Sequence, residues 1–396
     1  MPSGSNQTRM EINLEICTFV APCLFGLEKL LGEEIDALGY KRLQTIDGRI
    51  TFRAPLDEIP RMNIELRFAE RVLIELGSFR AETFTDLYDG VRELPWEDWI
   101  AQPDAFPVKG HSVKSKLFSI PDCQKIVKKA IVDCLSDQYG ILHFEESDVT
   151  YQVEFFLLRD TASLMIDTTG IPLHKRGYRP QTVTAPLRET LAAAMVRLAH
   201  PREDVLLWDP FCGSGTIAIE AALMMTHTAP GLNRSFAAET FPQIPARLWK
   251  DARDSARANI IETGFEAYAS DLDPQCVRIA ADTVKRAGMS RYIKVFQKDA
   301  LTITTENRRG TIVCNPPYGE RLLTLRQAEE LYRAMGKHFR TLDAWQIYVL
   351  TSHEDFQRLY GRRADKVRRL YNGMIRCNYY QFFRRQNDGQ NDKQQD

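Results

Sequence analysis

One segment near the middle of this 396-residue chain limits the fold more than any other. Val205–Asp209 has the apolar character of a buried strand, and Ile217–Met225 has the character of a buried helix. The turn between them reads PFCGSGT and contains Gly213 and Gly215. Glycines at a strand-to-helix turn let a ligand approach the backbone, and the helix N-terminus offers free N–H groups. Taken alone, the pair could equally serve only to turn the chain.

The second half of the chain alternates strand-like and helical segments. After the first strand, further strands are expected at Glu266–Asp271, Tyr292–Phe296, Thr311–Cys314 and Gln346–Thr351. This alternation predicts an α/β domain with a doubly wound, mainly parallel, Rossmann-like sheet. Val367–Tyr371 and Ile375–Phe383 flank Asn372-Gly373, which predicts a C-terminal antiparallel hairpin.

The first half predicts an α+β module. Strands are expected at Leu14–Val20, Arg49–Arg53 and Arg71–Leu76, and helices at Gly26–Ala37 and Ile59–Asn63. With one further strand this is the β-α-β-β-α-β order of a ferredoxin-like unit. Beyond it we expect a helix at Phe84–Leu94, a strand at Val113–Leu117, a long helix capped by Asp122 and ended by Gly140, and a hairpin of Val153–Leu158 with Ala162–Ile166.

Composition excludes several classes of protein. The formal net charge of −1 excludes a surface of one sign, but local basic patches can still bind nucleic acid. No stretch has the roughly 18–20 apolar residues of a membrane helix, and Met1–Met10 lacks the apolar core of a signal peptide. The eight cysteines form no C-x-x-C pair, so we expect reduced thiols in the cytoplasm and no structural metal.

Two motifs that are absent from the sequence limit the choice of ligand for the glycine turn. No lysine follows the glycines as in a phosphate loop, and the three-glycine dinucleotide fingerprint is incomplete. S-adenosylmethionine fits, because it presents a carboxylate and a ribose but no phosphate. Asp271 ends the second strand, where it can accept the ribose hydroxyls, and Asp299 follows the third, where it can accept an adenine amino hydrogen. Each aspartate alone is more often a helix cap.

A second motif follows the fourth strand: Asn315-Pro316-Pro317-Tyr318. Two prolines alone indicate a rigid turn. An exocyclic base amine is a poor nucleophile because its lone pair is delocalised into the ring. The carboxamide of Asn315 and the carbonyl of Pro316 can accept its two hydrogens, the prolines fix the geometry, and Tyr318 can stack an extruded base. Rate would then come mainly from positioning.

These motifs together carry a family resemblance. Asp209–Thr216 (DPFCGSGT) with Asn315–Arg321 (NPPYGER) resembles class I S-adenosylmethionine-dependent methyltransferases that act on exocyclic base amines. Four flanking segments narrow the resemblance to THUMP-domain guanine-N2 RNA methyltransferases of the bacterial 23S rRNA type: 114–125, 173–179, 185–191 and 229–236. Some rRNA relatives carry a second fused catalytic domain, whereas this chain has one.

The resemblance implies a domain plan and the roles of residues. The plan is disordered ends at 1–10 and 386–396, a ferredoxin-like unit at 11–80, a THUMP RNA-binding domain at 81–168, a linker at 169–185 and a Rossmann-like methyltransferase domain at 186–385. The Asn315–Tyr318 turn would carry the target amine. The cofactor would be held by Asp209, Phe211, Gly213, Gly215, Asp271, Asp299 and Asn315, and Thr190 would touch its methionine end.

Basic clusters indicate where RNA would bind. Between Lys109 and Lys129 six lysines accompany one acid, Asp122, and from Thr168 to Arg188 four basic residues accompany none. The expected phosphate contacts are Lys114, Lys116, Lys125, Lys128, Lys129, Lys175, Arg176 and Arg179. Tyr178 could stack a base or pack the domain junction. A third cluster at 357–369 is expected to be a solvated face.

The favoured hypothesis is methylation of a guanosine N2 amine in RNA, with 23S rRNA ahead of tRNA as the substrate. A DNA or protein amino methyltransferase would use the same turn, but the THUMP-like segments favour RNA. An RNA-binding or assembly factor without activity is the remaining alternative, and the intact aspartates and Asn-Pro-Pro-Tyr turn speak against it.

Overall fold

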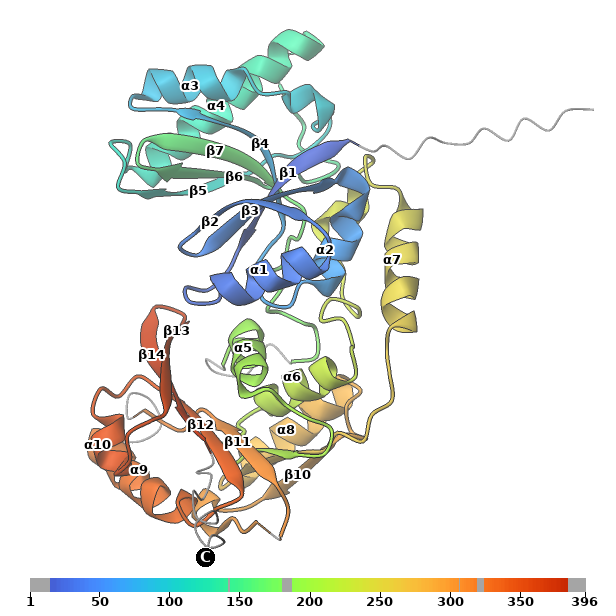
Figure 1. The fold of residues 1–396 in the computed structure, drawn as a ribbon. Helices are drawn as coiled ribbons and strands as arrows, with labels where there is room; N and C mark the ends of the chain where they lie inside the picture. Colours follow the sequence, from blue (N-terminus) through green and yellow to red (C-terminus); the bar gives the residue numbers. More distant parts are fainter. Residues whose placement is uncertain (1–14, 142, 180–186, 306, 319–323, 384–396) are drawn as a thin grey trace, which may run out of the picture.

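A computed structural model describes residues 15–141, 143–179, 187–305, 307–318 and 324–383. The ends expected to be disordered, 1–10 and 386–396, lie outside these residues, as do part of the expected linker and Gly319–Arg321 of the second motif. The chain forms two halves, and each half is built on one seven-stranded sheet (Figure 1).

The N-terminal half is a single sheet with strand order β2-β3-β1-β4-β7-β6-β5. Its elements are β1 Ile16–Pro22, α1 Glu28–Ala37, β2 Lys41–Ile46, β3 Arg49–Pro55, α2 Ile59–Glu65, β4 Leu73–Arg80, α3 Phe84–Arg92, β5 Val108–Val113, α4 Ile120–Tyr139, β6 Val153–Leu158 and β7 Thr161–Asp167. Antiparallel pairing of β4 with β7 joins the expected ferredoxin-like and THUMP units into one hydrogen-bonded sheet.

All four helices of this half cover the same face of its sheet. Phe19 pairs with Ile74, and Ile74 pairs with Ile166, so the three buried side chains share a face. They belong to one apolar core with Leu31 of α1, Met62 of α2, Leu87 of α3 and Val127 of α4. The opposite face carries a separate small cluster of Val20, Leu73 and Met165.

Two local predictions in this half are wrong. The strand expected at 113–117 is β5, which ends at Val113 because Lys114 takes a φ of 52°. Residue 110, inside this strand, is a glycine because a Cβ there would stand 2.4 Å from the ring of Phe155. The long helix is capped at Ser119 and not at Asp122, which lies in the first turn and accepts a hydrogen bond from the Ser119 hydroxyl.

The C-terminal half confirms the predicted α/β class. Its elements are α5 Glu189–Ala199, β8 Leu206–Asp209, α6 Thr216–Met225, α7 Ala246–Ala258, β9 Ala267–Asp271, α8 Pro274–Arg286, β10 Ile293–Gln297, β11 Gly310–Cys314, α9 Leu325–Phe339, β12 Trp345–Thr351, α10 Phe356–Tyr360, β13 Lys366–Asn372 and β14 Ile375–Phe382. Strand order is β10-β9-β8-β11-β12-β14-β13, with the first five parallel and β14 antiparallel to its neighbours. The sheet is covered by α5, α6 and α8 on one face and by α9 and α10 on the other.

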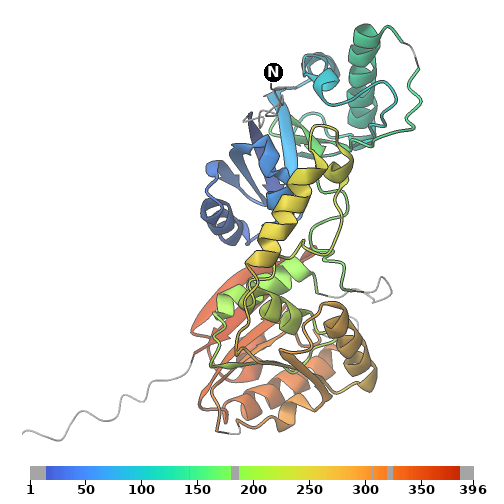
Figure 2. The same ribbon diagram turned by 90° about the vertical axis from the view of Figure 1, so that its right-hand side faces the viewer.

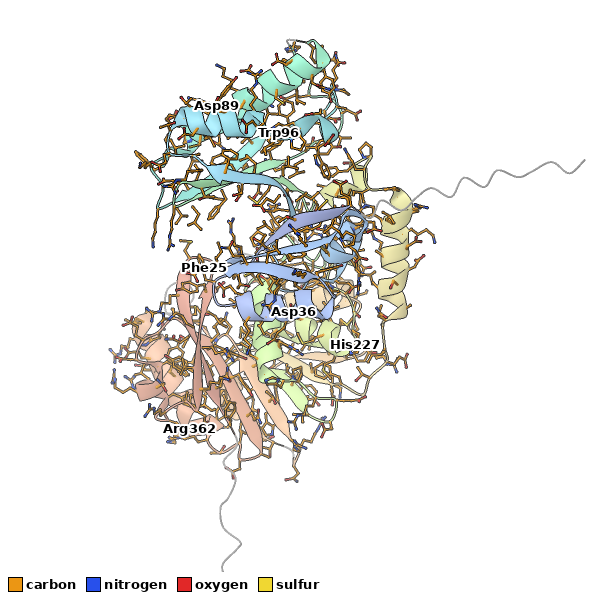
Figure 3. All side chains as sticks on the ribbon, turned by 45° about the horizontal axis from the view of Figure 1, so that its top comes forward. Phe25, Asp36, Asp89, Trp96, His227 and Arg362 are labelled. Atoms are coloured by element: carbon orange, nitrogen blue, oxygen red, sulfur yellow. The ribbon has the colours of Figure 1, made fainter. Side chains whose placement is uncertain are left out.

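The two halves meet over a continuous apolar core. Helix α7 belongs to the C-terminal half by sequence but lies along α2 of the N-terminal half (Figures 1 and 2). Close by, the Gly231 N–H donates to the Ile64 carbonyl over 2.9 Å. On the other side, the β13–β14 hairpin brings Tyr371 against Phe25, with ring centroids 5.7 Å apart; Figure 3 shows Phe25 at this border. Among the described helices, none is long and apolar enough to cross a bilayer.

Candidate active site

The sheet order brings the two sequence motifs together. Strand β8, which leads into the glycine loop (residues 210–215), lies between β9 and β11. All three run parallel, so the glycine loop, Asp271 at the end of β9 and Asn315 after β11 share the carboxyl edge of the sheet. In open α/β sheets this edge is where ligands bind.

The two glycines of the loop are required for different reasons. Gly213 has a φ of 51°, and a Cβ there would meet no atom within 4 Å, so the space above it is open. Gly215 has a φ of 80° and lies close to α8, because a Cβ would come to 3.5 Å from Ala280. The loop is tied to its neighbour strand by the Cys212 N–H, which donates to the Ser270 carbonyl over 3.0 Å.

The three aspartates have different surroundings. Asp209 is buried and accepts from the Phe211 N–H at 3.2 Å; burial, with the charge of Asp271, raises its pKa well above the usual range. Asp271 is half-buried and accepts from the N–H groups of Gly213 and Asp273, both at 3.0 Å. Asp299 accepts from the Leu301 N–H at 2.8 Å and so caps the short helix that follows β10. Asp271 therefore belongs to the loop itself, whereas Asp299 has the local role of a cap.

The second turn is held by a tyrosine that sequence reasoning missed. Tyr332 on α9 is fully buried, and its hydroxyl donates to the Pro317 carbonyl over 2.8 Å. The same hydroxyl lies 3.0 Å from the Thr351 hydroxyl at the end of β12. Because Tyr332 lies 15 residues from Pro317 on a separate helix, only its place on the apolar face of α9 could have pointed to it.

Tyr318 is half-buried and packs against the apolar core. Its hydroxyl donates to the Asn315 carboxamide oxygen, and Cys377 and Asn372 of the hairpin also lie against it. Burial raises the pKa of Tyr318 well above its ordinary value, so the phenol keeps its proton. In this arrangement the acceptor predicted for the target amine is bonded to Tyr318, and a base would have to displace that hydroxyl.

The hydroxyl of Thr190, expected at the methionine end of the cofactor, is committed elsewhere. Thr190 is fully buried and donates to Glu70 over 2.7 Å. Glu70, which follows the N-terminal unit's second helix, also bonds His174 at 2.7 Å and Arg188 at 3.1 Å. Thr190 therefore joins the two halves of the molecule, and its contact with the cofactor stays a prediction.

Two of the arginines predicted to contact RNA form ion pairs within the protein. Arg176 is buried; its guanidinium lies 3.4 Å from Glu220 and donates to the carbonyls of Leu173 and Arg67. Arg179 pairs with Glu189 at 3.3 Å and donates to the hydroxyl of Thr216, the first residue of α6. The Arg176 side chain is 2% exposed and the Arg179 side chain 11%, so little of either is open to an RNA.

Glu220 is the centre of this junction. It is fully buried on α6 and also lies 3.5 Å from Arg67 of the N-terminal half. Tyr178 donates to it over 3.0 Å, so of the two roles considered for this tyrosine, the structure shows the packing one. Sequence reasoning missed Glu220 because its partners lie 42 to 153 residues away.

The lysines expected to contact RNA differ in exposure. Lys114, Lys125, Lys129 and Lys175 are exposed. Lys116 is exposed but paired with Glu82. Lys128 is half-buried, stacked over Phe106 with its ammonium 3.5 Å from the ring centroid and paired with Glu146. Their contact with RNA stays a prediction.

Comparison with known proteins identifies the family. Residues 176–381 match the family model described as the RMKL-like methyltransferase domain. The chain belongs to this family. Residues 18–73 match the RlmL ferredoxin-like domain, and residues 81–167 match the THUMP domain. The resemblance and fold class predicted from the sequence are thus confirmed.

Relatives of this RMKL-like methyltransferase fall into two lengths. It is 43% identical over 370 residues to "Putative RNA methyltransferase YpsC" of Bacillus subtilis, covering 92% of this chain and 96% of the relative. It is 32% identical to the Psychromonas ingrahamii "Ribosomal RNA large subunit methyltransferase K/L", covering 91% of this chain but only 49% of that protein. The crystal structure of SMU.472 complexed with SAH is 37% identical and superposes with a TM-score of 0.87 over 94% of this chain and 97% of that one.

Proposed function

We propose that this chain transfers a methyl group from S-adenosylmethionine to the exocyclic N2 amine of a guanosine in RNA, with large-subunit rRNA as the substrate. The observation that carries the proposal is the placement of the Asn315–Tyr318 turn beside the glycine loop at one sheet edge. There a side-chain carboxamide next to a rigid Pro-Pro turn can bind an amine beside the position that the cofactor would occupy.

The residues at this edge fit S-adenosylmethionine. Space is open above Gly213, and the half-buried carboxylate of Asp271 beside it can accept hydrogen bonds from ribose hydroxyls. The next residue, Leu272, is 65% exposed and offers an apolar surface for a flat base. The nearby cation Arg179 is committed to Glu189 and Thr216, so the loop suits a ligand without a phosphate. When bound, this cofactor supplies an activated methyl group.

The chain's own residues would prepare the amine. The Asn315 carboxamide oxygen and the Pro316 carbonyl accept its two hydrogens, which leaves the lone pair less delocalised into the ring. Tyr332 holds the following carbonyl at Pro317, so the turn keeps its geometry before the base arrives. Catalysis would rest on positioning and hydrogen bonding, with no covalent nucleophile.

RNA as the substrate is supported by the THUMP match and by the exposed lysines in that domain. Large-subunit rRNA is supported by the name of the Psychromonas relative, of which this chain spans about half. We place the reaction in the cytoplasm, where the eight free cysteines would stay reduced.

Two measurements test the proposal. Nucleoside mass spectrometry of rRNA and tRNA from a deletion strain should show the loss of one N2-methylguanosine from large-subunit rRNA; a loss from tRNA alone would reassign the substrate. The purified Asn315→Ala variant should lose methyl transfer while calorimetry shows nearly unchanged binding of S-adenosylmethionine. An active Asn315→Ala variant would contradict the assigned role of the turn, and a wild-type protein that binds no S-adenosylmethionine would favour a non-catalytic RNA-binding factor.

A further inference from the structure

The loop between β5 and α4 (residues 114–119) holds an aromatic side chain in the open. Phe118 is 82% exposed, the largest exposed fraction of any aromatic residue in the described part of the chain. Leaving a phenylalanine in water forgoes the favourable free energy of its burial. None of the residues assigned above to cofactor, amine or RNA includes it.

The loop is fixed in position, so this exposure is part of the fold. The Lys116 N–H donates to Asp160 over 2.6 Å, and the Asp160 N–H donates to the Ser115 hydroxyl over 2.9 Å. The Ser112 hydroxyl donates to the Leu117 carbonyl over 2.6 Å, and the Leu117 side chain is buried next to Phe118 in the sequence. The backbone of such a loop is held in place before any partner arrives, which lowers the entropy cost of binding.

The charges around the loop favour a polyanion. Lys114, on the loop itself, is exposed and has no ion-pair partner among the described residues. Lys116 is 63% exposed, and Lys125 on the first turns of α4 is 80% exposed. Acids are present too: Lys116 pairs with Glu82, and Lys125 lies 3.8 Å from Asp122. An exposed ring among lysines is the combination that binds single-stranded nucleic acid, by stacking and by phosphate attraction.

We infer that Phe118 is a stacking platform for an unpaired base of the RNA, while Lys114 and Lys125 contact the phosphates beside that base. The inference rests on the proposed function, because it takes RNA as the substrate. Figure 1 places β5 and α4 at the end of the molecule remote from the catalytic sheet. Phe118 therefore acts in capturing RNA and not in the methyl transfer.

The test separates stacking from charge with the full-length protein. Its probes are a 12-nucleotide oligoadenylate and the abasic oligomer of the same length, which has the same phosphates but no bases. We expect wild-type protein to prefer the oligoadenylate and Phe118→Ala to weaken oligoadenylate binding by about 5- to 150-fold, with little change for the abasic oligomer. Phe118→Trp should bind like wild type. Leu43→Ala, which removes an exposed apolar side chain on β2, is the matched control.

Salt dependence gives an independent readout. Phe118→Ala should keep the wild-type slope of log affinity against log salt, whereas Lys125→Glu with Lys129→Glu should flatten it for both oligomers. On an in vitro transcript of large-subunit rRNA, Phe118→Ala should raise KM about as much as it weakens oligoadenylate binding, and leave kcat unchanged.

Four outcomes would overturn the inference. An affinity of Phe118→Ala for oligoadenylate within twofold of wild type would show that the ring stacks no base. An equal loss on both oligomers would show that the change acts through the fold or through charge. A loss seen on large-subunit particles but not on naked RNA would assign Phe118 to a protein contact. Wild-type protein that binds neither oligomer nor transcript would refute RNA as the substrate, and therefore the proposed function as well.

Discussion

Removing the buried carboxylate of Glu220 should weaken the junction between the two halves more than any surface change. The Glu220→Ala variant leaves the guanidinium groups of Arg67 and Arg176 without their shared anion. Their side chains are only 11% and 2% exposed, so bulk water solvates them poorly. Removing one partner of a buried ion pair costs about 3–5 kcal/mol. The hydrogen bond from the Tyr178 hydroxyl is lost as well, so we expect a loss near the upper end, about 5 kcal/mol.

The assay is urea unfolding followed by tryptophan fluorescence, with the free energy taken from the first transition. Tyr178→Phe should cost only about 1.5 kcal/mol, because Arg176 and Arg67 still neutralise Glu220. Asp254→Ala, which breaks the exposed pairs with Lys250 and Arg257, should leave the urea midpoint of the first transition nearly unchanged. A loss below about 1 kcal/mol for Glu220→Ala would refute the view that this carboxylate neutralises the junction.

Two further predictions concern the catalytic turn and the effect of pH. Tyr332→Phe removes the hydroxyl that holds the Pro317 carbonyl; kcat should fall about tenfold while the affinity for S-adenosylmethionine stays unchanged, and an unchanged kcat would show that the prolines alone fix the turn. Burial raises the pKa of Glu34 to about 7, against opposing contributions from the Phe68 N–H and the Arg67 charge. The folded protein therefore retains a proton that the unfolded chain releases near pH 4.5, and the contribution of Glu34 to stability should fall as pH rises from about 4.5 to about 7. Glu34→Gln lacks this titration, so its stability relative to wild type should improve between pH 5 and pH 8 in urea unfolding; parallel pH profiles would contradict the argument.

Strands and helices whose buried residues follow a regular pattern were predictable from the sequence, and those without such a pattern were not. β8, β9, β11 and β12 were placed within one residue at each end, because their runs are apolar and bounded by turns. β2 at the edge of the N-terminal sheet was missed: five of its six residues are exposed, so no alternation of buried and exposed residues marks it. The C-terminal hairpin was predicted from the Asn372-Gly373 pair, but its turn lies one residue later: Asn372 pairs with Ile375, and the turn residues are Gly373, which has the positive φ, and Met374.

In the candidate site, too, residues in short motifs were predictable from the sequence, and the ion-pair partners of the arginines were not. The glycine loop, Asp271 and the Asn315 turn come from short motifs, and parallel pairing brings them to one edge. Arg176 and Arg179 were predicted as surface cations because the stretch from Thr168 to Arg188 contains no acid, although Glu189 follows it directly. Their acids, Glu220 and Glu189, come from helices that only the fold brings close. Counting charges along the sequence does not reveal such partners. A motif at the end of a strand can be placed from the sequence, because the strand brings it to the edge of the sheet.

The continuous N-terminal sheet fixes the positions of the loops that it carries relative to the rest of the N-terminal half. β4 and β7 are hydrogen-bonded, so the loop that carries Phe118 cannot swing independently of the unit that holds Arg67. Arg67 is in turn paired with Glu220 on the helix that follows the glycine loop. These contacts therefore hold the lysine-flanked loop and the catalytic edge of the sheet at one distance from each other. A nucleotide would be selected by its distance from the captured strand, with less need to read the bases around it.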